Sequence, residues 1–265
     1  MNRLILILLL LAGVLTPAMA NLAEVFQDED PESQISIDHS PWGEILDRYL
    51  ISNHPSGVHL FDYDAVTESD RAQLVRYINS LENILPHRLN RDEQMAYWIN
   101  FYNALTVQVI LDAYPVSSIK KIRLPGSFGG PWKAKLVTVA GESLSLDDIE
   151  HEILRPIWKD ARIHYAVNCA SIGCPDLAMK PYNAKELEQM LEASAQAYIN
   201  HPRGVKWENG RLQLSSIFDW YKQDFGNREE LIAHLMSYAE GASKEALNQY
   251  SGRVRFHYDW DLNAP

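Results

Sequence analysis

The stretch NRDEQMAYWINFYNALTVQVILDAYP, residues 90–115, decides the fold. Asn90 followed three residues later by Glu93 is the pattern of a capping box, and Pro115 is typical of a helix end, so a helix is predicted between them. At 1.5 Å per residue this helix would be roughly 35 Å long. Apolar side chains occur nearly all round it, which predicts that it runs through the core.

A polar stripe follows one side of this predicted helix. At 100° per residue, Glu93, Tyr97, Asn100, Asn103 and Val107 fall on the same side. An unpartnered buried amide costs about 1–3 kcal/mol, so the stripe must face something polar. Two interpretations are open: the asparagines tie loop backbone to the core, or they line a site together with Glu93.

The other predicted elements surround this helix. Further helices are predicted at 69–85, 145–154, 184–199, 215–226 and after the Asn227–Glu230 cap. Strands are predicted at 135–141, 162–169 and 253–260, with a hairpin at 204–214 that turns at Asn209-Gly210. This order predicts an α+β fold: a helix-rich single domain with a long buried central helix packed on a small, mainly antiparallel sheet.

The first twenty residues have the pattern of a secretory signal peptide. Arg3 precedes an apolar run at 4–15, and Ala18 and Ala20 give an Ala-x-Ala ending. The run is too short for a mature transmembrane helix, and none is expected elsewhere. We therefore expect a periplasmic or secreted protein that starts at Asn21, with an N-terminal arm at 21–54 and one domain at 55–265.

Charge and composition narrow the expected partners. The net charge of -11 argues against a nucleic-acid partner, which needs a basic surface. His54 and His59 are five positions apart in a predicted loop with no third ligand at metal spacing, so neither a metal nor a cofactor is predicted. An unknown small molecule or peptide is the expected partner.

The stretch HYAVNCASIGCP, residues 164–175, holds both cysteines of the chain. In a straight strand, His164 and Asn168 share one face and Cys169 lies on the other. Cys174 follows a short loop and precedes Pro175, which favours the first turn of a helix, and a helix N-terminus lowers a thiol pKa. The resulting hypothesis has Cys174 as nucleophile, His164 as base and Asn168 or the central helix as the orienting group.

The competing interpretation is a Cys169–Cys174 disulfide. Neighbouring thiols tend to pair in an oxidising compartment, and this bridge would contribute about 2 kcal/mol. Two functions therefore stay open. One is a periplasmic hydrolase or acyl transferase that depends on cysteine and histidine. The other is a non-catalytic binding or interaction module with a structural disulfide.

Five segments together resemble the family catalogued as domain of unknown function 547. They are AYWINFYNAL, SLDDIEHEILR, HYAVNCASIGCP, IFDWYKQDFG and YDWDLN, in this order, and they cover roughly residues 55–263. The resemblance implies no established activity. It does imply that the helix bearing Asn100 and Asn103 meets the segment bearing His164 and Ser171 at one site, which makes Ser171 a further candidate for substrate binding.

The predicted layout is also loosely similar to papain-like and transglutaminase-like folds. Those folds place a nucleophile on a central helix and a histidine on a neighbouring strand. Here the central helix carries Asn100 and Asn103 and no cysteine. Either the nucleophile has moved to the 164–175 segment, or the site binds without covalent chemistry.

Overall fold

The predicted central helix is present as α4, Arg91–Ala113, in the computed structural model of the chain. The structure describes residues 21–125, 127 and 130–265, so the predicted signal peptide lies outside it. Asn90 caps α4 by accepting a hydrogen bond from the Glu93 N–H at 3.0 Å. The side chain of Glu93 does not complete the capping box, because it accepts from the N–H of Ile37 at 2.6 Å instead.

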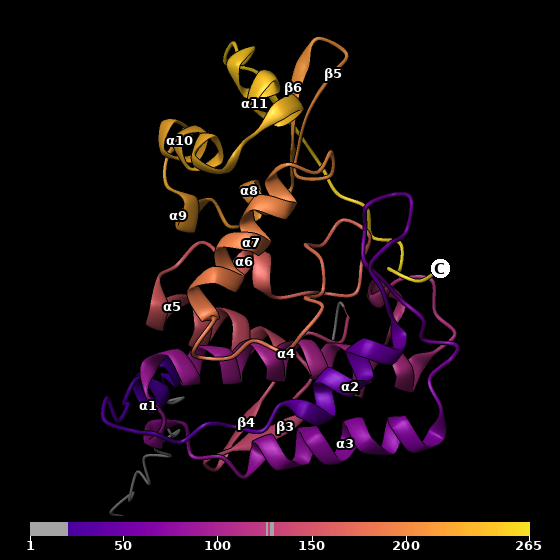
Figure 1. Ribbon diagram of the computed structural model, residues 1–265, viewed down its shortest axis with the longest axis vertical. Coiled ribbons are helices and arrows are strands. Elements are labelled where there is room, and N and C mark those ends of the chain that lie inside the picture. Colours follow the sequence, from indigo (N-terminus) through magenta and orange to yellow (C-terminus); the bar gives the residue numbers. More distant parts are fainter. Residues whose placement is uncertain (1–20, 126, 128–129) are drawn as a thin grey trace, which may run out of the picture.

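The described elements are mostly helical (Figure 1). The α-helices are α1 (Leu22–Phe26), α2 (Ser40–Tyr49), α3 (Glu68–Glu82), α4, α5 (Arg155–Trp158), α6 (Ile163–Ala166), α7 (Leu187–Ile199), α8 (Ile217–Trp220), α9 (Lys222–Phe225), α10 (Arg228–Tyr238) and α11 (Gly241–Asn248). Two 3-10 turns, η1 (Pro86–Arg88) and η2 (Ile119–Lys121), and a π-helix, η3 (Asp148–Leu154), accompany them. Within the described part of the chain, no helix is both long and apolar enough to span a bilayer.

The strands are short and mainly antiparallel. They are β1 (Leu50–Ile51), β2 (Leu60–Phe61), β3 (Val137–Val139), β4 (Glu142–Leu144), β5 (Val205–Glu208), β6 (Arg211–Ser215) and β7 (Val254–His257). The pairs β1–β2, β3–β4 and β5–β6 are antiparallel, and β7 joins β6 in parallel. Asn209 and Gly210 both have positive φ, as the predicted two-residue turn requires. The helix-rich α+β fold is therefore confirmed.

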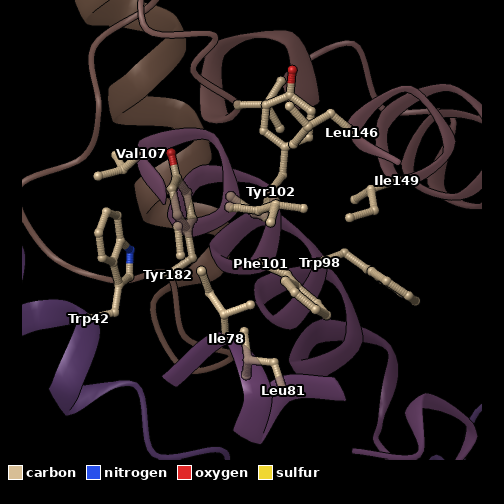
Figure 2. Close-up of a cluster of buried hydrophobic side chains, with 14 of the residues drawn as sticks. Trp42, Ile78, Leu81, Trp98, Phe101, Tyr102, Val107, Leu146, Ile149 and Tyr182 are labelled. Carbon is tan, nitrogen blue, oxygen red and sulfur yellow. The ribbon is translucent and has the colours of Figure 1, made fainter. Parts of the chain in front are cut away.

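The main hydrophobic core surrounds α4 (Figure 2). Trp42 of α2 and Ile78 of α3 approach it from one side, while Trp98 and Phe101 project from α4 itself. The ring of Phe26 lies edge-on to Trp98 with centroids 5.1 Å apart. The segment 21–54, expected as an N-terminal arm, therefore packs on the core through α1 and α2.

A second cluster of buried side chains lies at the other end of the molecule, around β5, β6 and α7 (Figure 1). Tyr165 of α6 belongs to this cluster, whereas Ile163, Ala166 and Val167 belong to the main core. The segment 163–167 thus packs between the two clusters, with side chains in each. Apolar side chains are needed on both of its sides, which explains the alternating pattern in the sequence.

Two local predictions in the 162–175 region were wrong. Residues 163–166 form the helical turn α6 rather than a strand, and the chain becomes extended only from Val167. Pro175 does not start a helix, because 175–178 has no regular structure, so Cys174 is not at a helix N-terminus. Tertiary contacts override the local pattern here: Asn103 of α4 binds the Ala166 carbonyl and the Asn168 N–H.

Residues 258–263 run antiparallel to residues 170–173, which lie between the two cysteines in the sequence, and pair with them. Gly173 N–H donates to the Asp259 carbonyl at 2.8 Å, and Asn263 N–H donates to the Ala170 carbonyl at 3.2 Å. A Cβ atom at Gly173 would lie 2.8 Å from the backbone N and O of Asp259. Glycine is therefore required for this close approach.

Candidate functional site

The two cysteines lie in the wall of a cleft of about 330 Å³. Side chains reach it from α4, from the η3 region, from α8 and the residue after it, and from the segment that follows β7. The lining residues are Tyr102, Trp132, Asp147, Glu150, His151, His164, Val167, Cys169, Cys174, Pro175, Ile217, Trp220, Tyr221, Tyr258 and Trp260. Segments far apart in the sequence therefore build one concave, largely aromatic site.

Contacting aromatic rings form one wall of the cleft. Trp220 stacks on Trp260 with centroids 5.5 Å apart and lies 4.8 Å from the ring of Tyr258. Trp132 meets Trp260 edge-on at 5.8 Å. Trp220 is nonetheless 46% exposed. An exposed indole within an aromatic concave surface is typical of a ligand-binding site.

His164 lies at the cleft in a fixed orientation. Its Nε2 is 2.6 Å from Oδ2 of Asp224, and its ring stacks on Tyr221 with centroids 4.1 Å apart. Its Nδ1 is 3.8 Å from Oε1 of Glu150 and has no hydrogen-bond partner among the described residues. The arrangement is that of a base held by an aspartate with one nitrogen free.

Asp224 carries the negative charge in this arrangement. Burial favours its neutral form, but the hydrogen bonds from His164 and from Arg155, whose Nε is 2.5 Å away, outweigh burial. The pKa of Asp224 is therefore well below its usual range. An ionised Asp224 favours the tautomer of His164 with its proton on Nε2, in which Nδ1 is a hydrogen-bond acceptor.

Glu150 forms the acidic floor of the cleft. The phenols of Tyr102 and Tyr221 line the cleft with it, and burial raises the pKa of both, so they stay protonated. His151 Nδ1 lies 3.7 Å from Glu150 Oε1. Burial also raises the pKa of the neighbouring Asp147. The floor can thus accept hydrogen bonds from a ligand or balance a positive charge.

The two sulfur atoms lie at disulfide distance, with Cα atoms 6.3 Å apart. Cys174 is buried and Cys169 is partly exposed. The Tyr258 hydroxyl lies 3.0 Å from Sγ of Cys174 and 3.2 Å from Sγ of Cys169. Ser171 Oγ lies 3.0 Å from the same hydroxyl. The hydroxyls of Ser171 and Tyr258 therefore contact each other and the sulfur pair.

The asparagines of α4 bind backbone. Asn100 donates to the Tyr182 carbonyl at 2.8 Å and accepts from the Tyr182 N–H at 2.9 Å. Asn103 donates to the Ala166 carbonyl at 2.9 Å and accepts from the Asn168 N–H at 2.8 Å. Each side-chain amide thus both donates and accepts a hydrogen bond, which supports the interpretation that the asparagines tie loops to the core.

Asn168 is used in the same way. Its amide donates to the Pro175 carbonyl at 2.7 Å and accepts from the Ala170 N–H at 2.7 Å. These two bonds shape the turn that brings Cys174 to Cys169. Of the predicted site residues, His164, Cys169 and Cys174 line the cleft, whereas Glu93, Asn100 and Asn103 are outside its lining. Their predicted catalytic and binding roles stay predictions.

Several cleft residues were not singled out from the sequence. Glu150, Tyr221 and Asp224 surround His164, and Trp220 and Trp260 form the aromatic wall. No local spacing connects them, because they are brought together only by the fold. The available signal was their presence in the motifs SLDDIEHEILR, IFDWYKQDFG and YDWDLN, which accompany the cysteine segment.

Fold and site together define a helix-rich α+β protein with an aromatic cleft beside a closely spaced cysteine pair. Residues 86–199 match the family model described as protein of unknown function, DUF547. The matched segment holds α4, Glu150, His164 and both cysteines, which confirms the resemblance. No curated protein and no solved structure matches the chain.

Proposed function

We propose that the protein is an exported binding module whose cleft takes a small organic ligand or a peptide side chain. The observation that carries this proposal is the row of contacting aromatic rings that ends in the exposed indole of Trp220. Flat apolar surfaces of this kind stabilise a bound ring or hydrocarbon, and the polar groups below fix its orientation.

The floor of the cleft indicates the polar character of the ligand. Glu150 lines the cleft with the phenols of Tyr102 and Tyr221 and lies near His151 and Asp147. Aromatic faces and carboxylates both attract a positively charged or donor-bearing group. The ligand that fits best therefore has an apolar ring and an amino group or comparable donor.

Binding of tryptamine, an aromatic amine, tests this function. We expect the amine to give a saturable heat of binding in a calorimetric titration and to raise the melting temperature of the protein. Trp220→Ala should abolish the shift, since it removes the exposed part of the aromatic wall. Trp207→Ala, on β5 and outside the cleft, is the matched control. Equal binding by both variants would show that the cleft is not the binding site.

Export is supported by Arg3, the apolar run at 4–15 and the Ala-x-Ala ending. Expression of the full chain in a bacterium with separation of periplasm and cytoplasm tests it. We expect a periplasmic protein whose first residue is Asn21. Recovery of a protein that still carries Arg3 in the cytoplasm would contradict the proposal.

A hydrolase or acyl transferase is the second candidate function. Its specific support is the His164–Asp224 pair at 2.6 Å, with Nδ1 of His164 left free of hydrogen bonds within the described chain. Cys174 would act as nucleophile only after its bond to Cys169 is reduced. Ester hydrolysis by the reduced protein that is lost in Cys174→Ala and His164→Ala would support this candidate, and equal rates in all three proteins would exclude it.

A further inference from the structure

The cysteine pair presents one sulfur to the cleft more than the other. Cys169 and Cys174 both line the cleft, but Cys169 is partly exposed and Cys174 is only 3% exposed. A thiol that enters the cleft therefore reaches Sγ of Cys169 more readily than Sγ of Cys174. Attack by an external thiol is decided by such access.

Three hydrogen-bond donors converge on the buried sulfur. Sγ of Cys174 lies 2.9 Å from the backbone N of Cys169, 3.0 Å from the Tyr258 hydroxyl and 3.5 Å from the Ser171 hydroxyl. A sulfur atom in a disulfide is a weak acceptor, whereas a thiolate is charged and accepts much more strongly. These donors are therefore matched to a negatively charged Cys174.

Tyr258 is a donor to Cys174 that keeps both its proton and its position. The residue is half-buried, and the burial of its phenol raises its pKa well above the ordinary value, so its proton stays in place. The fold also holds it there, because the following residue, Asp259, binds Gly173 at 2.8 Å. The donor is thus fixed before any charge develops on sulfur.

We propose that the Cys169–Cys174 pair exchanges with a small organic thiol in the cleft, which makes the protein a thiol–disulfide oxidoreductase. The inference rests on the proposed function only in that the thiol enters the ligand cleft. The pair is the electron acceptor in this direction, and the thiol is the reductant. In the opposite direction the reduced pair would reduce an organic disulfide.

The exchange proceeds in two steps. An organic thiolate attacks Sγ of Cys169, a new sulfur–sulfur bond forms, and the electron pair of the broken Cys169–Cys174 bond goes to Cys174. A second thiolate then attacks the bound organic sulfur and displaces Cys169 as a thiolate. Two organic thiols are oxidised to one disulfide, and their two protons pass through solvent to the two cysteines.

The donors around Cys174 act on the first step. Exchange is faster when the leaving sulfur has a lower pKa, and hydrogen bonds to a thiolate lower that pKa. Cys174 is thus the leaving group and Cys169 the attacked sulfur. Ser171 and Tyr258 are positioning residues for this reaction, since they act through Cys174.

Exchange with glutathione tests the proposal. The folded protein is equilibrated with mixtures of reduced and oxidised glutathione. Its free thiols are then alkylated, and the mass of the product is measured by mass spectrometry. We expect the ratio of dithiol to disulfide protein to follow, within minutes, the square of the reduced glutathione concentration divided by the oxidised glutathione concentration. Cys174→Ser should accumulate glutathione on Cys169, and Cys169→Ser should be labelled about tenfold more slowly because Cys174 is buried. No exchange over hours, or faster labelling of Cys174, would overturn the proposal.

The thiolate absorbance of Cys174 in the Cys169→Ser variant tests the donor set directly. We expect its pKa to lie below the ordinary thiol value of about 8.5. Adding Tyr258→Phe should raise this pKa, and Tyr258→Phe in the native protein should slow its reduction by about tenfold. Tyr250→Phe, outside the cleft, should change neither quantity. An ordinary or raised pKa that Tyr258→Phe leaves unchanged would refute the role of Cys174 as leaving group.

The two proposals fail separately. Exchange with glutathione does not require the indole of Trp220, whereas tryptamine binding does. Loss of tryptamine binding in Trp220→Ala with normal exchange would support both. A protein that binds tryptamine but does not exchange with glutathione would support the binding function and contradict the oxidoreductase activity. A protein that exchanges with glutathione but does not bind tryptamine would support the oxidoreductase activity and contradict the binding function.

Discussion

Asn103 of α4 ties the cysteine segment to the core through two hydrogen bonds. It satisfies two backbone groups, the Ala166 carbonyl and the Asn168 N–H. Asn103→Ala leaves both without this partner in a buried place, so we expect a loss of about 2–4 kcal/mol in the free energy of unfolding. Urea denaturation measures it. Asn79→Ala, at an exposed position of α3, is the control, and equal losses would mean that the two bonds contribute nothing.

His39 gives a pH dependence with a definite sign. Burial lowers the pKa of His39 to about 4, which the neighbouring Asp38 opposes only weakly, and its Nδ1 lies 2.6 Å from the Tyr77 hydroxyl. The ordinary value is about 6.5, so the unfolded chain takes up this proton first. The contribution of neutral His39 to the free energy of unfolding is therefore fully present above about pH 6.5, and it is lost as the pH falls from there to about 4.

The expected size of this effect is about 2 kcal/mol more loss of stability between pH 7 and pH 5 in the native protein than in His39→Gln. Denaturation at the two pH values measures the difference. His87→Gln, at an exposed position, should behave as the native protein. Parallel pH curves for the native protein and His39→Gln would show that His39 is protonated equally in the folded and unfolded states.

At the scale of elements, Gly173 permits the antiparallel contact between 170–173 and 258–263. Its missing Cβ leaves room for the Asp259 backbone, which a methyl group would meet at 2.8 Å. We expect Gly173→Ala to destabilise the protein by roughly 1–3 kcal/mol and to weaken tryptamine binding, because Tyr258 is displaced. Thermal melting and calorimetric titration test both effects. Gly43→Ala in α2, where the Cβ would lie 3.4 Å from Pro181, should be tolerated.

The elements that the sequence predicted correctly have local signals at their ends. Asn90 caps α4, and Asn227 and Glu230 form the complete capping box of α10. Asn209 and Gly210 supply the positive φ values of the β5–β6 turn. Each signal is a contact between residues within a few positions, so the sequence alone is sufficient to read it.

The elements that the sequence did not predict depend on distant partners. The pattern at 162–169 alternates because Tyr165 and its neighbours face two different cores, not because the segment is a strand. The aromatic wall joins Trp132, Trp220 and Trp260 from separate parts of the chain. Asp224 meets His164 across 60 positions. The shared family motifs linked the segments of His164, Trp220, Asp224 and Trp260 in advance, but they do not include Trp132.

At the scale of the whole molecule, Asn263 joins three distant segments. Its carbonyl accepts from the Phe61 N–H, its side chain accepts from the Tyr63 hydroxyl at 2.8 Å, and its N–H binds Ala170. Tyr63→Phe removes one buried bond, so we expect a loss of about 1–2 kcal/mol in the free energy of unfolding. Chemical denaturation measures it. Tyr114→Phe, in the ring stacked on Tyr63, should lose less, and an equal loss would assign the effect to ring packing.

The contacts of residues 258–263 also determine when the cleft can be completed during synthesis. Tyr63 and Asn263 are 200 positions apart, and contacts of such long sequence separation form late and slowly. A nascent chain that emerges from the ribosome N-terminus first can build α4 and the core around it early. It cannot place Tyr258 against the sulfur pair, or Trp260 against Trp220, until those residues have been made. The scaffold can therefore exist in the growing chain before the site does.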